Sequence, residues 1–167
     1  MKTEPYELPV STSDGEFTAR YSEDGLAELD FPKGQKPRSR SKRPLAVVPG
    51  KIRAWHRLTE AALALILAGR PAKKLPPLVW SGKTEFQQAV WRELLNIRCG
   101  STRSYGEIAT LIGRPKAVRA VGGACGANPI PVLVPCHRVL AANQKIGGFS
   151  GGLAWKKTLL TREGIAL

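Results

Sequence analysis

Apolar and polar residues alternate in two short runs near the amino terminus, as they do in strands with one buried face. The apolar positions are Phe17, Ala19 and Tyr21 in the first run and Ala27, Leu29 and Phe31 in the second. Turn signals rich in Asp and Gly stand before each run, at 13–15 and 23–25. Residues 6–31 are therefore predicted to form a small antiparallel meander.

From residue 52 onward the spacing of apolar residues changes to that of a helix. A helix is predicted from Ile52 to Ala68, where Gly69-Arg70-Pro71 stops it. Its one-sided apolar stripe consists of Ile52, Trp55, Ala62, Leu65 and Ile66. The apolar run at 61–68 is too short to span a membrane, so this helix is expected in a core.

Two capping boxes mark the starts of further helices. Thr84 pairs with Gln87 at the start of one, and Ser104 pairs with Glu107 at the start of a shorter one that runs to about Ile112. A Ser or Thr with a Glu or Gln three residues later satisfies the free backbone groups of a first helical turn. Both helix starts are therefore predicted at these residues.

A fourth helix is predicted from about Lys116 to Ala127, after the turn Gly113-Arg114-Pro115. Together with the helix before it, it has the dimensions of a helix-turn-helix. Its small residues are Ala117, Ala120, Gly122, Gly123, Ala124, Gly126 and Ala127. Two interpretations stand: the helix packs tightly inside the protein, or its backbone closely approaches a ligand such as a narrow DNA groove. The long side chain that projects from its middle is that of Arg119.

These elements predict an α+β fold in two units. Residues 1–80 hold a small antiparallel sheet with a helix, and residues 81–167 form a mostly helical unit with the helix-turn-helix and Cys136. The stretch 32–50 interleaves proline with Lys and Arg, and we expect a basic, mobile connection there. The 167 residues, 43% of them hydrophobic, suffice for a buried core.

The net charge of +13 indicates an anionic partner, most commonly nucleic acid. Residues 1–80 carry 14 Lys and Arg against 9 Asp and Glu, whereas residues 81–167 carry 12 against 4. The second unit is basic because acids are scarce in it, so its surface can lie against phosphates without repulsion.

Three cysteines and two histidines make a disulfide framework or a four-ligand zinc site improbable, and reduced thiols fit better. The amino terminus is polar and acidic, unlike a secretory signal. We therefore expect a protein of the cytoplasm, or of the nucleus if the source has one, with no bound metal and no membrane contact.

Cys136 has the setting of a reactive thiol. It follows a short buried strand that is predicted at 132–134 and ended by Pro135, which would hold the nucleophile rigidly. His137 is adjacent, and it can act as a base if it reaches back, directly or through a water molecule, and if a carboxylate polarises it. Glu163 is the one acid downstream of Cys136 and is the natural candidate.

The run Pro135-Cys136-His137-Arg138-Val139 resembles the active-site signature of the methylated-DNA–protein-cysteine methyltransferases, or 6-O-alkylguanine-DNA alkyltransferases. The similarity extends in order and spacing over about residues 84–164. The other matching motifs are Phe86 through Trp91, Ser104-Tyr105-Gly106, Arg119-Ala120-Val121-Gly122-Gly123, Asn128-Pro129, Ser150-Gly151-Gly152 and Arg162-Glu163-Gly164.

The resemblance implies a DNA-repair methyltransferase that acts without a cofactor. Such a protein binds double-stranded DNA through the minor groove and flips out 6-O-methylguanine, another 6-O-alkylguanine or 4-O-methylthymine. It transfers the alkyl group irreversibly to its own Cys136. Because water does not cleave the resulting thioether, each molecule acts once, and we expect it to act as a monomer.

The resemblance also implies roles for individual residues. Cys136 accepts the alkyl group, His137 takes its proton through water, and Glu163 orients His137. Tyr105 gives a proton or a hydrogen bond to the departing guanine. Asn128 braces the turn between the fourth helix and the segment that carries Cys136.

The DNA-binding residues implied in this way are Arg119, Tyr105, Ala120, Gly122 and Gly123. Arg119 would enter the base stack and fill the gap left by the flipped nucleotide. Small residues beside it would let the helix serve any sequence, since readout in the minor groove is degenerate.

The implied substrate pocket has two kinds of wall. Val139 and Ser150 would read the guanine edges together with backbone groups of Cys136, and the alkyl pocket would be lined by Pro131, Phe149 and Cys125. Phe149 stands where some relatives have Tyr, and Cys125 stands where some have a larger residue. A wider pocket with one hydroxyl fewer is therefore expected.

Three other classes fit the sequence less well. Alkyltransferase-like binding proteins have Trp where this chain has Cys136. A helix-turn-helix regulator would need several long polar residues on its recognition helix, and a thiol protease would need a separated Cys and His with a peptide groove.

Overall fold

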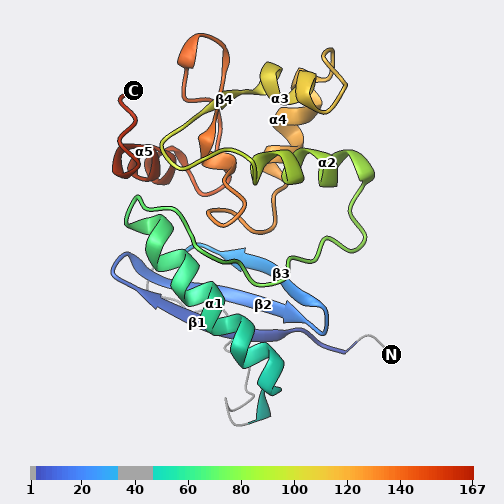
Figure 1. The fold of residues 1–167 in the computed structure, drawn as a ribbon, viewed down its shortest axis with the longest axis vertical. Helices are drawn as coiled ribbons and strands as arrows, with labels where there is room; N and C mark the ends of the chain where they lie inside the picture. Colours follow the sequence, from blue (N-terminus) through green and yellow to red (C-terminus); the bar gives the residue numbers. More distant parts are fainter. Residues whose placement is uncertain (1–2, 34–46) are drawn as a thin grey trace.

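The computed structural model describes residues 3–33 and 47–167 (Figure 1). It confirms the predicted meander: β1 (Tyr6–Thr12), β2 (Gly15–Ser22) and β3 (Gly25–Asp30) form one antiparallel sheet in the order β1-β2-β3. The alternation along β2 works as predicted, because Phe17, Ala19 and Tyr21 are buried. The two tight turns place Gly15 and Gly25 at φ values of +117° and +154°, which favour glycine.

The helix α1 (Gly50–Leu67) packs along the sheet (Figure 1). The predicted stripe was partly wrong, because Trp55 and Leu65 are only half-buried. Polar residues occupy part of the buried face instead: His56 Nδ1 lies 2.9 Å from the Tyr21 hydroxyl, which is also 2.8 Å from Thr59 Oγ1. Mutual hydrogen bonds allow these groups to be buried, and a search for apolar spacing overlooks them.

The chain then crosses from the first unit to the second along the edge of the sheet. The Leu26 amide donates to the Pro77 carbonyl at 2.7 Å, and the Val79 amide donates to the Leu26 carbonyl at 2.9 Å. These two bonds pair the start of β3, at Leu26, with the crossing segment. The predicted boundary at residue 80 falls at the end of this segment, and the division into two units stays a prediction.

The second unit is mostly helical, which confirms the predicted α+β class. Its elements are α2 (Glu85–Leu94), β4 (Arg103–Ser104), α3 (Tyr105–Leu111), α4 (Val118–Gly126), the 3₁₀ turns η2 (Cys136–Arg138) and η3 (Ala142–Gln144), β5 (Val139–Leu140) and α5 (Leu153–Arg162). In Figure 1 they occupy the upper half, above the sheet and α1. Both predicted capping boxes are present, at Thr84 and at Ser104.

The part of the basic connection at 34–46, which includes most of its charged residues, lies outside the described residues. Within the described ranges, no helix is both long enough and apolar enough to cross a membrane.

Candidate active site

The segment before Cys136 is buried, as expected, but the predicted strand at 132–134 is wrong. Val132 has a φ of +73°, and the Val134 amide donates to the Ile130 carbonyl at 3.0 Å, so the chain turns here. Pro131 and Pro135 flank these three residues. Because proline has no backbone N–H, the segment cannot continue the hydrogen-bonded ladder of a strand. Apolar composition predicted the burial but not the conformation.

Asn128 closes this turn with its side chain. The Asn128 Oδ1 accepts from the Ile130 amide at 3.0 Å, and its Nδ2 donates to the Val134 carbonyl at 2.9 Å. One amide group therefore satisfies two backbone groups that a turn would otherwise bury without partners. The turn leads directly into η2, whose first residue is Cys136.

His137 and Glu163 meet in the interior, although 26 positions separate them. His137 Nε2 lies 3.0 Å from Glu163 Oε1, and the side chains of both are completely buried. Burial opposes ionisation of Glu163, but the hydrogen bonds from His137 and Arg138 outweigh it and lower the pKa of the carboxyl to about 2.

This geometry decides which nitrogen of His137 carries the proton. An ionised carboxylate can only accept, so Nε2 donates and Nδ1 is left unprotonated in the neutral ring. Burial lowers the pKa of His137, against the opposing effect of Glu163, so the ring is neutral near pH 7. Among the described residues Nδ1 has no hydrogen-bond partner. It is a buried base that is free to take a proton.

Arg138 holds the same carboxylate in a fixed orientation. Its Nε and one terminal nitrogen lie 2.9 and 2.8 Å from the two Glu163 oxygens, and its other terminal nitrogen donates to the Ile97 carbonyl at 2.7 Å. Such a fork is the geometry that guanidinium and carboxylate prefer. Arg138 lies in the motif around Cys136, but its part in the site could not be predicted from the sequence, since it depends on Glu163, 25 positions away.

Cys136 is almost completely buried and protonated at rest. Burial raises the pKa of its thiol to about 11, against smaller opposing effects of a hydrogen bond with Asn128 and of the Lys156 charge. The thiol is therefore inert without a base, unlike an exposed low-pKa cysteine.

Lys156 is a buried charge that sequence reasoning missed. Its Nζ donates to the carbonyls of Val139 at 2.7 Å and Gly148 at 3.1 Å. Burial lowers the pKa of this ammonium, while the nearby thiols of Cys136 and Cys125 favour its charged form. A signal was available, because position 156 shares a helical face with the buried positions 159, 160 and 163.

Tyr105 is brought to the thiols by local structure. The parallel pairing of β4 with β5 sets Ser104 opposite Leu140, and Tyr105 follows as the first residue of α3. Burial raises the pKa of Tyr105 to about 12, with smaller contributions from Cys125 and Cys136. The phenol therefore remains a proton donor at neutral pH. Cys125, also buried, has its pKa raised by burial to about 12.

The three glycines of α4 face outward. A Cβ added at Gly122, Gly123 or Gly126 would meet nothing within 4 Å, so packing inside the protein does not require glycine there. Arg119 and Ala120 are exposed on the same helix. Trp91 supports α4 from beneath, since its indole N–H donates to the Ala124 carbonyl at 2.8 Å. Of the two interpretations of this helix, the geometry favours close approach to a ligand.

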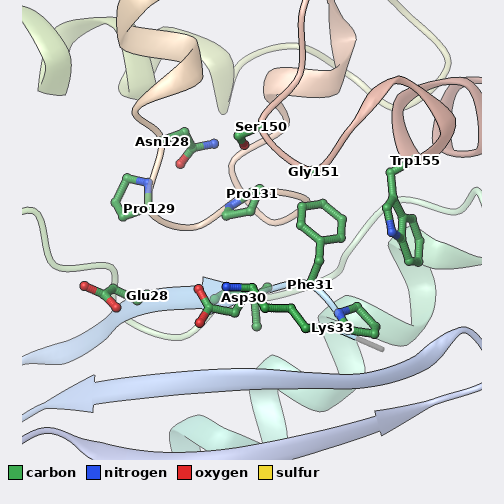
Figure 2. Close-up of a pocket in the computed structure, with 12 residues that line it drawn as sticks. Glu28, Asp30, Phe31, Lys33, Asn128, Pro129, Pro131, Ser150, Gly151 and Trp155 are labelled. Atoms are coloured by element: carbon green, nitrogen blue, oxygen red, sulfur yellow. The ribbon is translucent and has the colours of Figure 1, made fainter. Parts of the chain in front are cut away.

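The residues named from the sequence thus fall into three places. The first is the buried site at the Cys136 thiol, which also holds His137, Glu163, Tyr105, Asn128, Cys125 and Val139. Pro131 and Ser150 line a cleft of about 430 Å³, which Figure 2 shows, and Phe149 contacts the ring of Phe31, which lines the same cleft. Arg119, Ala120, Gly122 and Gly123 lie on α4. In the described parts of the chain, no three His, Cys, Asp or Glu side chains are placed to hold a metal ion.

Comparisons with known proteins agree on one family. The family model described as 6-O-methylguanine DNA methyltransferase, DNA binding domain, matches residues 85–165. The methylated-DNA–protein-cysteine methyltransferase of Methanosarcina acetivorans is 44% identical over 161 residues, which are 95% of this chain and 96% of that protein.

Two mycobacterial proteins are also similar. The methylated-DNA–protein-cysteine methyltransferase of Mycobacterium bovis is 58% identical over 80 residues, and this match spans about half of each protein, 48% of either length. The crystal structure of Mycobacterium tuberculosis OGT in complex with DNA has a TM-score of 0.69 and 36% identity, and the match covers 93% of this chain and 90% of that one.

Proposed function

The chain belongs to the methylated-DNA–protein-cysteine methyltransferase family, and we propose that it repairs DNA by moving an alkyl group from guanine to its own Cys136. The observation that carries this proposal is the neutral, buried ring of His137, the residue next to Cys136. Its Nε2 lies 3.0 Å from Glu163 Oε1. Arginine and histidine together keep that carboxylate ionised. A protonated thiol, a free basic nitrogen and a fixed carboxylate are what this transfer needs.

In the proposed reaction the thiol proton passes to His137 Nδ1, directly or through a water molecule. The resulting thiolate attacks the alkyl carbon on guanine O6, so that an S–C bond forms as the C–O bond breaks and its electron pair goes to the base. Tyr105 donates to the departing guanine, whose developing negative charge would otherwise make it a poor leaving group. Glu163 stabilises the imidazolium, and Lys156 stabilises the thiolate electrostatically.

The proposed DNA contact is made by α4. Its outward glycines leave room for the edge of a minor groove, and Arg119 would occupy the base stack when the nucleotide flips out. The excess of 12 Lys and Arg over 4 Asp and Glu in residues 81–167 supports contact with phosphates. α3 and α4 would then act as a helix-turn-helix that reads no sequence.

The proposed substrate is double-stranded DNA that contains 6-O-methylguanine or a larger 6-O-alkylguanine, and 4-O-methylthymine is a further candidate. Pro131, Phe149 and Cys125 would surround the alkyl group, while Val139 and Ser150 would contact the guanine edges. We propose that the protein acts as a monomer in the cytoplasm, or in the nucleus of a cell that has one, because its substrate is the genome.

The deciding experiment is a mass measurement after incubation with a duplex that contains 6-O-methylguanine. We expect one methyl group on the peptide that bears Cys136, in an amount equal to the guanine repaired. Cys136→Ser is the matched control and should remain unmodified while still binding the duplex. An unmodified Cys136 after complete repair, or no repair by folded protein, would overturn the proposal.

A further inference from the structure

An aromatic cluster joins the amino-terminal sheet to the loop beside the proposed alkyl site. The ring of Phe31, just beyond β3, has its centroid 5.5 Å from Phe17, 5.1 Å from Trp155 and 5.7 Å from Phe149. Phe31 and Phe149 meet edge to face, the arrangement that aromatic pairs prefer. Phe149 comes from the second unit, 118 positions along the chain, so this contact exists only in the folded protein.

Phe31 also lies directly against the backbone of the loop. A Cβ added at Gly151 would lie 2.5, 2.8 and 2.9 Å from three atoms of the Phe31 ring, closer than real Cβ atoms come. Gly151 is not among the residues with positive φ, so backbone conformation does not demand glycine there. Glycine is required because the Phe31 ring takes the space of a side chain.

The loop has two anchors of different origin. From the second unit, Lys156 Nζ donates to the Gly148 carbonyl at 3.1 Å, and the Gly152 amide donates to the Phe149 carbonyl at 3.0 Å. From the first unit, Phe31 supports the loop between these two bonds. Because glycines at 147, 148, 151 and 152 make this loop intrinsically pliable, its shape depends on such supports.

Phe31 also lines a cleft that it shares with residues of the proposed substrate pocket. The cleft of about 430 Å³ is lined by Phe31 on the side of the sheet and by Pro131, Ser150 and Gly151 on the other side (Figure 2). Figure 2 shows the Phe31 ring extending from the end of the strand toward Gly151 and Pro131, with Trp155 beside it. The amino-terminal sheet therefore forms one wall of a cleft whose other wall carries Pro131 and Ser150, two residues of the proposed substrate pocket.

We infer that Phe31 is a positioning residue for alkyl transfer: it holds the loop 149–151 through Phe149 and Gly151, and so limits the size of the alkyl group that Cys136 accepts. This inference rests on the proposed function, because it assigns a specificity role within the same site. It gives the amino-terminal unit a part in the reaction although that unit contains none of the reacting groups.

The test compares two alkyl groups in the same duplex, 6-O-methylguanine and 6-O-benzylguanine, by single-turnover alkylation of Cys136. Phe31→Ala removes the ring, which should loosen the loop and widen the cleft. Because small displacements near reacting atoms cost large factors in rate, methyl transfer should slow roughly tenfold. Benzyl transfer should slow less, and the benzyl-to-methyl rate ratio should rise roughly fivefold. Phe31→Leu keeps apolar bulk, so its methyl-transfer rate and its benzyl-to-methyl ratio should both lie close to those of the parent protein.

Gly151→Ala provides a second arm. In the parent protein the new methyl group collides with the Phe31 ring and should slow methyl transfer. In Phe31→Ala the collision is gone and the methyl group fills part of the vacated space, so there the same change should be neutral or favourable. This non-additivity is expected of residues in contact. Additive effects, or equal slowing of both alkyl groups by Phe31→Ala, would overturn the inference.

Asp14→Asn is the matched control, because it weakens a different contact between the units. Arg162 donates to both oxygens of Asp14 at 2.7 and 2.8 Å, a contact that involves no residue of the loop 149–151. This variant should lose stability without changing the benzyl-to-methyl ratio. A ratio change as large as that of Phe31→Ala would show a general loosening of the two units and refute a specific role of Phe31.

Amide hydrogen exchange of the loop separates this inference from the proposed function. Phe31→Ala should speed exchange in peptides that cover 145–152 with little change in α4, whether or not the protein transfers alkyl groups. Unchanged loop exchange would refute the support by Phe31. If the parent protein shows no alkyl transfer but Phe31→Ala speeds exchange in the loop as expected, the proposed function is refuted and the support of the loop by Phe31 is confirmed.

Discussion

The imidazole Nε2 of His137 lies 3.0 Å from the Glu163 carboxylate, and neither side chain is exposed to solvent. The pair joins η2 to the end of α5 and sets the protonation states on which the proposed chemistry depends. Glu163, His137 and Lys156 in this buried site, and Arg119 and Gly123 on α4, can each be tested on purified protein.

Glu163 makes stability sensitive to acid. Its pKa is about 2 in the folded protein against an ordinary value of 4.5, so the unfolded chain binds more protons between these values. The stabilisation is fully present above about pH 4.5 and is lost as pH falls toward 2, and it amounts to about 3 kcal/mol at ~1.4 kcal/mol per pH unit. Urea unfolding over this pH range measures it.

Glu163→Gln removes the titrating group and should flatten that acid-dependent loss. It also leaves Arg138 without its charged partner, so stability at neutral pH should fall by about 3–5 kcal/mol. Parallel pH profiles for the parent and the variant would contradict the assignment of the acid sensitivity to Glu163.

The rate of alkyl transfer should depend on pH through His137. Transfer requires the neutral ring, and burial lowers the pKa of His137 below its ordinary value of 6.5. The single-turnover rate should therefore be level across neutral pH and decline only when the solution becomes more acidic than 6.5. A rate that already declines from pH 8 to pH 7 would indicate that another group supplies the base.

Lys156 should stabilise the thiolate form of Cys136. Lys156→Met removes a positive charge near the thiol and two hydrogen bonds, to the Val139 and Gly148 carbonyls, so the pKa of Cys136 should rise and transfer should slow about tenfold. The pH dependence of Cys136 labelling by iodoacetamide gives the pKa. Lys157→Met, the same change at the exposed neighbouring position, should leave both quantities unchanged.

Arg119 should matter for duplex DNA and little for the chemical step. Arg119→Ala should slow repair of 6-O-methylguanine in a duplex roughly 100-fold, because base flipping loses the side chain that fills the gap. Reaction with the free base 6-O-benzylguanine should change less than about twofold, since no base needs to be flipped. The exposed Arg114 in the turn before α4 provides a matched charge control. Equal slowing with both substrates would exclude the stack-filling role.

Gly123 should be dispensable for folding and required for DNA binding. Nothing lies within 4 Å of a Cβ at this position, so Gly123→Leu should fold at least as stably as the parent protein. The larger side chain should block approach to the groove and weaken binding of duplex DNA at least about tenfold. Gly123→Ala is the small-residue control and should bind normally. Undiminished binding by Gly123→Leu would place the DNA contact elsewhere.

The sequence by itself determined the features that depend on neighbouring residues. Thr84 and Ser104 begin helices because each finds its capping partner three positions along the chain, and the glycines at 15 and 25 form the hairpin turns because few other residues adopt their φ values. The motif around Cys136 identified the family for the same reason, since its residues are contiguous. Proximity in the chain is enough to specify such structure.

Tertiary structure decided everything that depends on residues far apart in the chain. One local feature also escaped the apolar pattern: the Asn128 side chain and two flanking prolines make a turn at 132–134 in place of the predicted strand. Lys156 became part of the site because α5 turns that position toward the thiol. Phe31 reaches Gly151 across 120 positions. These contacts form because packing brings separate elements together, and the pattern of apolar and polar residues says which faces are buried but not which side chains meet.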